Sequence, residues 1–443
     1  MMIEMPQDVR FIIGELNKKG FEAYAVGGCV RDSILGRTPN DWDITTSATP
    51  FEVKDIFRRT VDTGLQHGTV TVLIKDQGYE VTTYRIDGEY TDHRRPDEVT
   101  FTRELSEDLL RRDFTINAMA YNDETGIVDL YGGIQDLEEG VIRCVGNPDD
   151  RFDEDALRIM RAVRFAAQLG FSVDSATREA AAKHAPELSQ VSAERIETEL
   201  TKLLISDHPE KVVDMYELGI TSIILPEFDK MMETEQNSPY HMYDVGRHTV
   251  EVIKNVPPTK VMRYAALLHD IGKPQCKTTD DKGVDHFKGH AMVSEEMSTK
   301  ILKRLRMDND TIRDVKKIVR WHDYGISGVI TKKSVRKMLS SMGEQYFGEY
   351  LDIKRADMKG QSDYRLAERE EVLSDIIRFH DEIMEEGNAL SIKDLAVNGK
   401  DIMDLGIPKG PKVGETLSYL LERVLEEPTL NEKSKLEDII KGL

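Results

Sequence analysis

Two aspartates, Asp41 and Asp43, stand at the start of a β-rich run over residues 42–46. On a strand, side chains two residues apart point to one face, about 7 Å apart along the chain. Carboxylates so placed repel each other unless a divalent cation neutralises them, and Mg²⁺ commonly takes one or two carboxylates together with substrate phosphates. Glu80, on a second β-rich run over residues 80–84, would add a third acid if the two runs are neighbours. The pattern predicts metal-assisted phosphoryl transfer, and the alternative is a set of solvated acids.

A glycine pair, Gly27 and Gly28, precedes the aspartates and lies between a β-rich run over residues 23–26 and a helical stretch. Glycines let backbone N–H groups approach a phosphate, and the start of a helix favours anions. Arg31 adds a fixed cation on the same stretch. These residues predict a triphosphate site, although a Gly-Gly pair alone is also an ordinary chain turn.

A segment over residues 154–165 follows helical periodicity, with an apolar stripe on one side and Arg158, Arg161 and Arg164 spread over the other. Asp155 and Arg158 are i,i+3 neighbours that can brace each other. An acceptor beside a donor matches the amino group and ring nitrogen of cytosine and adenine, and mismatches uracil and guanine. The segment predicts selection of a base by protein groups alone. The alternative is a solvated helix face with surface ion pairs.

A histidine-rich region over residues 240–357 holds six of the eleven histidines. Imidazoles and carboxylates together bind divalent transition metals, and a bound metal can generate a hydroxide nucleophile. Lys273 could hold a phosphate as a point charge, and we expect His241 and His286 beside the cluster or on the surface. The residues predicted to converge are His248, His269, Asp270, His290, His322 and Asp357.

The composition sets broad limits. A chain of 443 residues has room for about three domains, and its three cysteines exclude a disulfide scaffold and fit a reducing cytoplasm. No apolar run approaches the roughly 18 residues of a membrane span. The net charge of −21 argues against a protein that coats nucleic acid non-specifically. RNA binding would need a local basic surface, for which the candidates are Lys332, Lys333, Arg336, Lys337, Lys409 and Lys412.

The segments, taken in chain order, resemble the bacterial-type (class II) tRNA nucleotidyltransferases, the CCA-adding enzymes, and their poly(A) polymerase relatives. Residues 27–32 with 41–43 resemble the first motif, residues 111–119 the second and residues 154–158 the nucleotide-selecting motif. Residues 192–196 resemble the neck signature, and residues 398–411 the carboxy-terminal segment. The middle region resembles the metal-dependent HD phosphohydrolases, which some members carry.

The resemblance implies an α+β protein. A small nucleotidyltransferase head of polymerase β-like fold with a mixed sheet (1–137) would precede an all-α neck (138–235), an HD-type body (236–365) and a tRNA-binding tail (366–443). It implies Asp41 and Asp43 as Mg²⁺ ligands and catalytic residues together with Glu80. The implied nucleotide-binding residues are Gly28, Arg31, Arg112, Asp155, Arg158, Arg161 and Arg164. The six clustered histidines and aspartates would hold Mn, Ni, Fe or Co.

The implied reaction adds C, C and A to the 3′ end of tRNA from CTP and ATP and releases pyrophosphate, with no DNA or membrane partner. Residues 85–99, with Asp87, Tyr90, Asp92, Arg94, Arg95 and Pro96, resemble the flexible loop that full CCA-adding members use when they switch from C to A. Three alternatives stay open: a poly(A) polymerase, a member that adds only part of CCA, and an HD-type phosphohydrolase with a non-catalytic head.

Overall fold

The computed structural model describes residues 2–88, 99–325 and 329–443 and forms two compact units. The first unit comprises Met1–Asp229 with Arg304–Met307, and the second comprises Lys230–Lys303 with Asp308–Leu443. The finer division of the chain at residues 137, 235 and 365 stays a proposal. Among the described residues, no helix is both long and apolar enough to cross a membrane.

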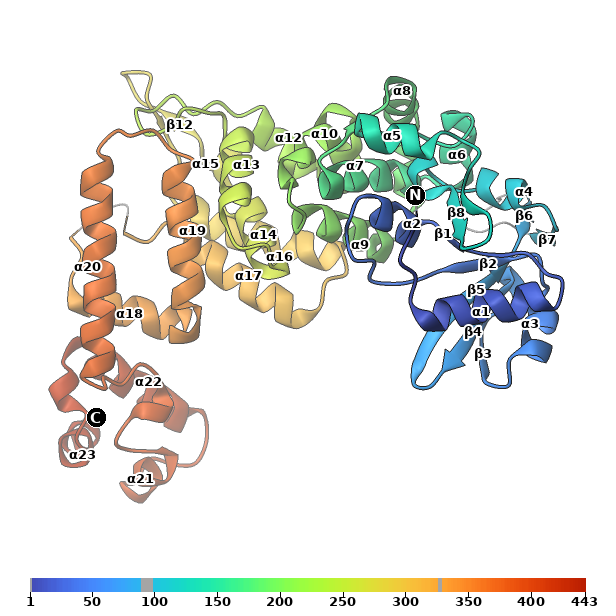
Figure 1. The fold of residues 1–443 in the computed structure, drawn as a ribbon. Helices are drawn as coiled ribbons and strands as arrows, with labels where there is room; N and C mark the ends of the chain where they lie inside the picture. The colour runs from blue at the N-terminus through green and yellow to red at the C-terminus, as the bar shows by residue number, and fades with distance from the viewer. Residues whose placement is uncertain (1, 89–98, 326–328) are drawn as a thin grey trace. The chain divides into compact units, whose positions relative to one another are not determined.

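A seven-stranded mixed sheet forms the core of the first unit, in the order β3-β4-β5-β2-β1-β8-β9 (Figure 1). The pair β2–β5 is parallel, with Ile44 opposite Val81, whereas the other neighbours are antiparallel. The central strand β1 is buried along its length and pairs with β8 through Ala25 and Tyr121. The strands are β1 (Ala23–Val26), β2 (Ile44–Thr46), β3 (Thr60–Gly64), β4 (Thr69–Ile74), β5 (Gln77–Thr83), β8 (Met119–Asn122) and β9 (Gly126–Asp129).

The sequence located several of these strands. The run at 23–26 has the observed bounds, and the run at 80–84 overlaps the end of β5. The run at 42–46 was wrong at its start, because β2 begins only at Ile44. Asp41 and Asp43 are exposed and precede the strand, although the carbonyl of Asp43 still accepts the N–H of Val26 at 3.0 Å. The two aspartates therefore do not sit on a regular strand as expected.

Helices pack around this sheet and then continue without it. Helix α1 is amphipathic and buries Val9, Ile12, Ile13 and Leu16. Two small two-stranded sheets, β6–β7 (Arg85–Asp87, Val99–Phe101) and β10–β11 (Val141–Ile142, Ser172–Val173), complete the strands of the first unit. Its helices are α1 (Gln7–Lys18), α2 (Gly28–Ile34), α3 (Pro50–Ile56), α4 (Leu105–Leu110), α5 (Gly133–Glu139), α6 (Pro148–Glu154), α7 (Leu157–Leu169), α8 (Ser175–His184), α9 (Ala193–Leu204), α10 (Val212–Glu217) and α11 (Ile220–Ile224); α12 (Pro226–Met232) reaches into the second unit.

Among its described residues, the second unit is helical except for one small hairpin, β12–β13 (Thr278–Thr279, Asp285–His286). Helix α17 illustrates why these segments are helical. Its apolar residues recur at helical spacing, so Ile312, Val315, Ile318 and Val319 lie buried on one face, and Asp308 caps the first turn. A mixed sheet followed by helices confirms the predicted fold class. The helices are α13 (Val245–Asn255), α14 (Lys260–Leu268), α15 (Lys273–Cys276), α16 (His290–Arg304), α17 (Asn309–Trp321), α18 (Lys332–Met342), α19 (Phe347–Lys359), α20 (Leu366–Glu385), α21 (Gly399–Asp404), α22 (Pro411–Glu426) and α23 (Lys433–Lys441).

Candidate active site

Three acids share one electrostatic environment beside β2 and β5. Because Ile44 pairs with Val81, Glu80 on β5 lies level with Asp43. Desolvation raises the pKa of Glu80, and repulsion from Asp43 and Asp41 adds to it. Desolvation also raises the pKa of Asp43, where Asp41 adds to the effect and Arg112 opposes it. The ligand atoms of these three carboxylates do not all lie within 4.8 Å of one another, so they do not form a closed metal site. They form an acidic group whose negative charge is only partly neutralised.

The glycine turn lies against Arg112. Gly27 has φ of +83°, and its N–H donates to the carbonyl of Met119 at 3.1 Å. The positive φ favours glycine, and a Cβ at this position would lie 2.9 Å from a terminal guanidinium nitrogen of Arg112, which would have to move. The Nε of Arg112 is buried without a hydrogen bond. A terminal nitrogen of Arg112 contacts Asp108 at the long distance of 3.5 Å. The guanidinium thus keeps donor capacity beside the turn, which suits a phosphate oxygen.

Arg31 is held in place by three neighbours. Its Nε donates to Asp32 at 2.9 Å and a terminal nitrogen donates to Asn117 at 2.8 Å, while the guanidinium lies 5.1 Å from the ring centre of Phe165. The side chain is 11% exposed. Its position is fixed as expected, and its role toward a triphosphate stays a prediction.

The expected bracing of Asp155 by Arg158 is wrong. Asp155 accepts the N–H of Leu157 at 3.1 Å and a guanidinium N–H of Arg195 at 2.6 Å. Arg158 pairs with Glu154 and donates to the carbonyl of Arg111 at 3.2 Å. The reason is local: Asp155 ends α6 in an extended conformation, and α7 begins at Leu157. The i,i+3 geometry of a continuous helix therefore does not apply.

The other two arginines of α7 also have partners that the sequence did not reveal. Arg161 donates to Asp113 at 2.6 and 2.9 Å, and Arg164 donates to Glu199 on α9 at 2.7 Å. Burial lowers the pKa of Arg164 to about 10 in spite of Glu199. The carboxylate of Asp113 is occupied by Arg161 and Asn117. For these partners the sequence contained one signal: Arg195 lies in the neck signature, and Glu199 follows that signature.

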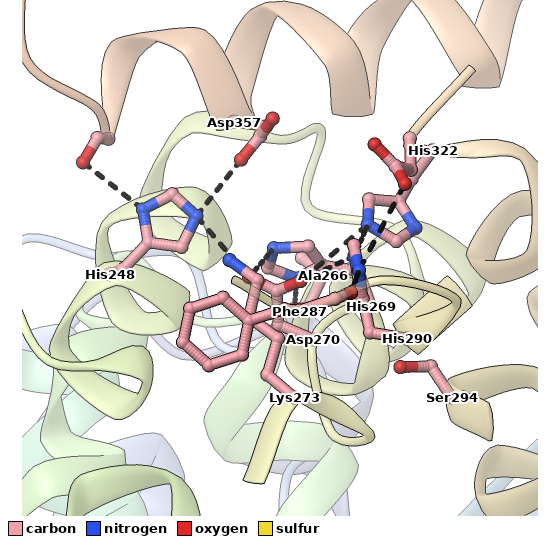
Figure 2. Close-up of polar contacts among 12 residues, drawn as sticks. His248, Ala266, His269, Asp270, Lys273, Phe287, His290, Ser294, His322 and Asp357 are labelled. Carbon is pink, nitrogen blue, oxygen red and sulfur yellow. Dashed lines mark hydrogen bonds and ion pairs between the residues drawn. The ribbon is translucent and has the colours of Figure 1, made fainter. Parts of the chain in front are cut away.

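A second candidate centre lies in the second unit, where the six predicted residues converge (Figure 2). His248 lies on α13, Asp357 on α19, and His290 begins α16. His269 and His322 follow the last residues of α14 and α17. None of the six residues is more than 7% exposed.

The four imidazoles share one hydrogen-bonding pattern. In each ring, Nδ1 lies 2.7–3.1 Å from a backbone carbonyl: Gly360 for His248, Ala266 for His269, Phe287 for His290 and Val319 for His322. A carbonyl only accepts, so Nδ1 carries the proton and Nε2 presents a lone pair. The Nε2 atoms of all four rings lie 3.2–3.7 Å from the carboxylate of Asp270. Backbone-fixed imidazoles with convergent lone pairs are the arrangement of metal ligands.

Asp270 belongs to one of two neighbouring groups of potential ligands and lies close to the other. Ligand atoms of His248, His269 and Asp357 lie within 4.8 Å of one another, and so do those of Asp270, His290 and His322. Neither oxygen of Asp270 receives a hydrogen bond of good geometry, although the Lys273 ammonium lies 2.7 Å away. Burial opposes ionisation, but His269 and Lys273 hold the pKa of Asp270 well below its usual range. The donor set therefore fits divalent cations.

The remaining expectations fall around these centres. His241 is half-buried with its ring 5.6 Å from that of His248, and His286 is exposed and lies 3.0 Å from Asp280. Lys273 is buried and donates to Gln236 at 2.8 Å. Strands β6 and β7 pair at the two ends of the expected flexible loop. Tyr90, Asp92, Arg94, Arg95 and Pro96 lie outside the described residues.

Comparison with known families gives the class of protein. Residues 23–143 match the Poly A polymerase head domain, residues 170–232 the Probable RNA and SrmB-binding site of polymerase A, and residues 287–440 the tRNA nucleotidyltransferase domain 2. Fold and site thus define a nucleotidyltransferase with a polymerase-type head. The three models carry no HD-domain description, so the resemblance to HD phosphohydrolases rests on the residues alone.

The relatives give the family. The chain is 35% identical to the CCA-adding enzyme of Levilactobacillus brevis over 96% of its length and 95% of the relative. It therefore belongs to the family of CCA-adding enzymes. It is 54% identical to the enzyme of Lactiplantibacillus plantarum over 203 residues, a stretch that spans about half of that relative (50%). The crystal structure of the Bacillus stearothermophilus CCA-adding enzyme in complex with CTP is similar at a TM-score of 0.72 and 29% identity, covering 99% of this chain and 98% of that one.

Proposed function

We propose that this protein adds C, C and A to the 3′ end of tRNA from CTP and ATP. The terminal 3′-hydroxyl attacks the α-phosphorus, a phosphodiester bond forms, and the bond to pyrophosphate breaks. The observation that carries the proposal is the acidic group of Asp41, Asp43 and Glu80, in which Arg112, beside the glycine turn, is the cation that opposes the raised pKa of Asp43.

The side chains of the first unit have distinct tasks in this proposal. Asp41 and Asp43 would hold Mg²⁺, which supplies charge neutralisation for the phosphates and a lower pKa for the attacking hydroxyl. Arg112, Arg31 and the turn at Gly28 bind the triphosphate. Asp155 and Arg158 contact the base edge, and each is held by a different residue. Asp155 is held by Arg195, and Arg158 by Glu154. Arg161 and Arg164 hold α7 in place through their ion pairs with Asp113 and Glu199.

The test is extension of a tRNA that lacks its 3′ CCA, with each nucleoside triphosphate separately and in pairs. We expect two additions with CTP alone and a third when ATP is also present. Asp43→Asn should abolish extension, whereas Asp62→Asn, an exposed aspartate of the same sheet, should not. Long tails with ATP alone would instead identify a poly(A) polymerase, and arrest after two additions a CC-adding member.

We also infer a metal centre at the histidine cluster, with phosphoester hydrolysis as its activity. The convergent Nε2 lone pairs and the buried carboxylate of Asp270 support it. A bound Mn, Ni, Fe or Co ion would supply an activated water, and the residues that would hold it are His248, His269, Asp270, His290, His322 and Asp357.

Metal content tests this centre without reference to turnover. The protein is incubated with each of the four metals, desalted and measured by elemental analysis, together with His269→Ala, Asp270→Asn and the control His286→Ala. We expect one to two ions per chain in the unaltered protein and the control, and fewer in the two cluster variants. Equal metal content in all four proteins would contradict the centre. Loss of extension with Asp43→Asn but not with His269→Ala would also exclude a non-catalytic head.

A further inference from the structure

Asp108 on α4 is a fully buried carboxylate with 0% exposure, and neither the motifs nor the proposed reaction assigns it a task. One of its oxygens accepts two N–H groups of Arg111, at 2.8 and 3.0 Å. The other accepts the hydroxyl of Thr45 at 3.0 Å and a guanidinium N–H of Arg112 at 3.5 Å. One side chain therefore contacts three residues from two separate segments.

Each contact leads to a different part of the candidate active site. Thr45 lies on β2, two residues after Asp43. Arg112 lies against the glycine turn at Gly27. The backbone carbonyl of Arg111 accepts a guanidinium N–H of Arg158 at 3.2 Å, so the position of Arg111 also affects the base-selecting arginine. Asp108 is thus the point at which the acidic, phosphate and base elements meet.

The charge of Asp108 is needed for these contacts. A buried carboxylate is costly to desolvate unless cations and hydrogen bonds compensate. Burial raises the pKa of Asp108, but Arg111 and Arg112 outweigh it and hold the pKa below its usual value. Arg111 is held by short bonds, whereas Arg112 is held by one long contact and has a buried Nε without a hydrogen bond. Arg112 is therefore oriented by charge and keeps donors for an incoming anion.

We propose that Asp108 is a positioning residue for the nucleoside triphosphate: it holds Arg112 against the glycine turn and, through Arg111, fixes the carbonyl that orients Arg158. It never touches the nucleotide itself. The proposal rests on the nucleotide site described above, and it extends that site to a residue buried behind it.

The test measures affinity for CTP and ATP by isothermal titration calorimetry in the full chain, and KM and kcat in the extension assay. Asp108→Asn should weaken binding and raise KM about tenfold for both nucleotides, with a smaller change in kcat, because a charge-assisted contact is lost. In an Arg112→Ala background the same change should add less than about twofold, since its main route of action has gone. Asp62→Asn, in an exposed ion pair with Lys54 at 2.9 Å, is the matched control.

Two outcomes overturn the proposal: unchanged nucleotide affinity in Asp108→Asn, or full additivity with Arg112→Ala, which would show a merely structural role. Thr45→Val removes the hydroxyl contacts with Asp108 and with the carbonyl of Thr82, keeps the charge of Asp108, and should weaken binding about two- to threefold; no effect there would count against the proposal if Asp108→Asn does not fold. Calorimetry separates this result from the proposed reaction. An unaltered protein that binds CTP but never extends tRNA contradicts the reaction, whereas one that binds neither nucleotide contradicts the positioning role as well.

Discussion

The ion pair between Glu199 and Arg164 should stabilise the first unit more than any surface pair. Its two side chains are 5% and 7% exposed and lie 2.7 Å apart, and it joins α9 to α7. Glu199→Gln keeps the shape and removes the charge, so Arg164 stays buried beside two neutral partners, the new amide and Gln168. Removing one member of a buried pair costs about 3–5 kcal/mol. For a unit of this size, each kcal/mol lowers Tm by about 2–4 °C, so we expect a shift of about 6–20 °C.

The assay is thermal unfolding of the full chain, followed by circular dichroism and by loss of CTP binding. Glu217→Gln is the control, because its pair with Arg178 is exposed by 53% and 35% and should be worth at most about 1 kcal/mol. Replacing both buried partners, as Arg164→Met with Glu199→Leu, should restore much of the lost stability. The reasoning is refuted if Glu199→Gln shifts Tm no more than the control does.

Three further predictions concern single residues. Asp155→Ala should raise misincorporation of UTP relative to CTP roughly 5- to 150-fold, as 1–3 kcal/mol of base discrimination is lost; unchanged selectivity would exclude Asp155 as a base reader. Gly27→Ala should cost about 1–2 kcal/mol of stability at its left-handed φ and weaken CTP binding, because the new Cβ displaces Arg112; calorimetry and melting measure both. The pKa of His184 is raised, since its bonds to two acids outweigh burial, so its stabilisation is present below about pH 6.5 and is lost as pH rises through the raised value. His184→Gln should therefore lower Tm more at pH 5.5 than at pH 8.5, and equal shifts would contradict the assignment.

Sequence patterns located the residues of both candidate sites, because those residues lie next to strong local signals. Gly27 marks a positive φ, and the β-rich runs place Glu80 beside the aspartates. The clustered histidines were found because each lies on, or at the end of, an amphipathic helix. These are short-range regularities, which a single sequence contains.

Partner choice could not be predicted in the same way, because it depends on long-range packing. Asp155 pairs with Arg195 and Arg161 with Asp113, over separations of 40 and 48 residues. Several bases proposed for RNA contact have internal partners as well. Lys333 and Lys337 pair with Glu426, Lys332 pairs with Glu382, and Arg336 donates to the carbonyl of Leu425. The positive charge of these lysines is therefore partly neutralised within the chain's own helices, which reduces what they offer to RNA phosphates.

The pairing of β1 with β8 constrains how the protein emerges from the ribosome. Ala25 and Tyr121 are 96 residues apart, and β1 is the strand that leads into the glycine turn. At about 5–20 residues per second, translation needs roughly 5–20 s to deliver the second partner after the first. Throughout that interval the nascent head has an open, apolar β1 edge, which makes it a natural client for chaperones and a point at which stalled synthesis favours aggregation.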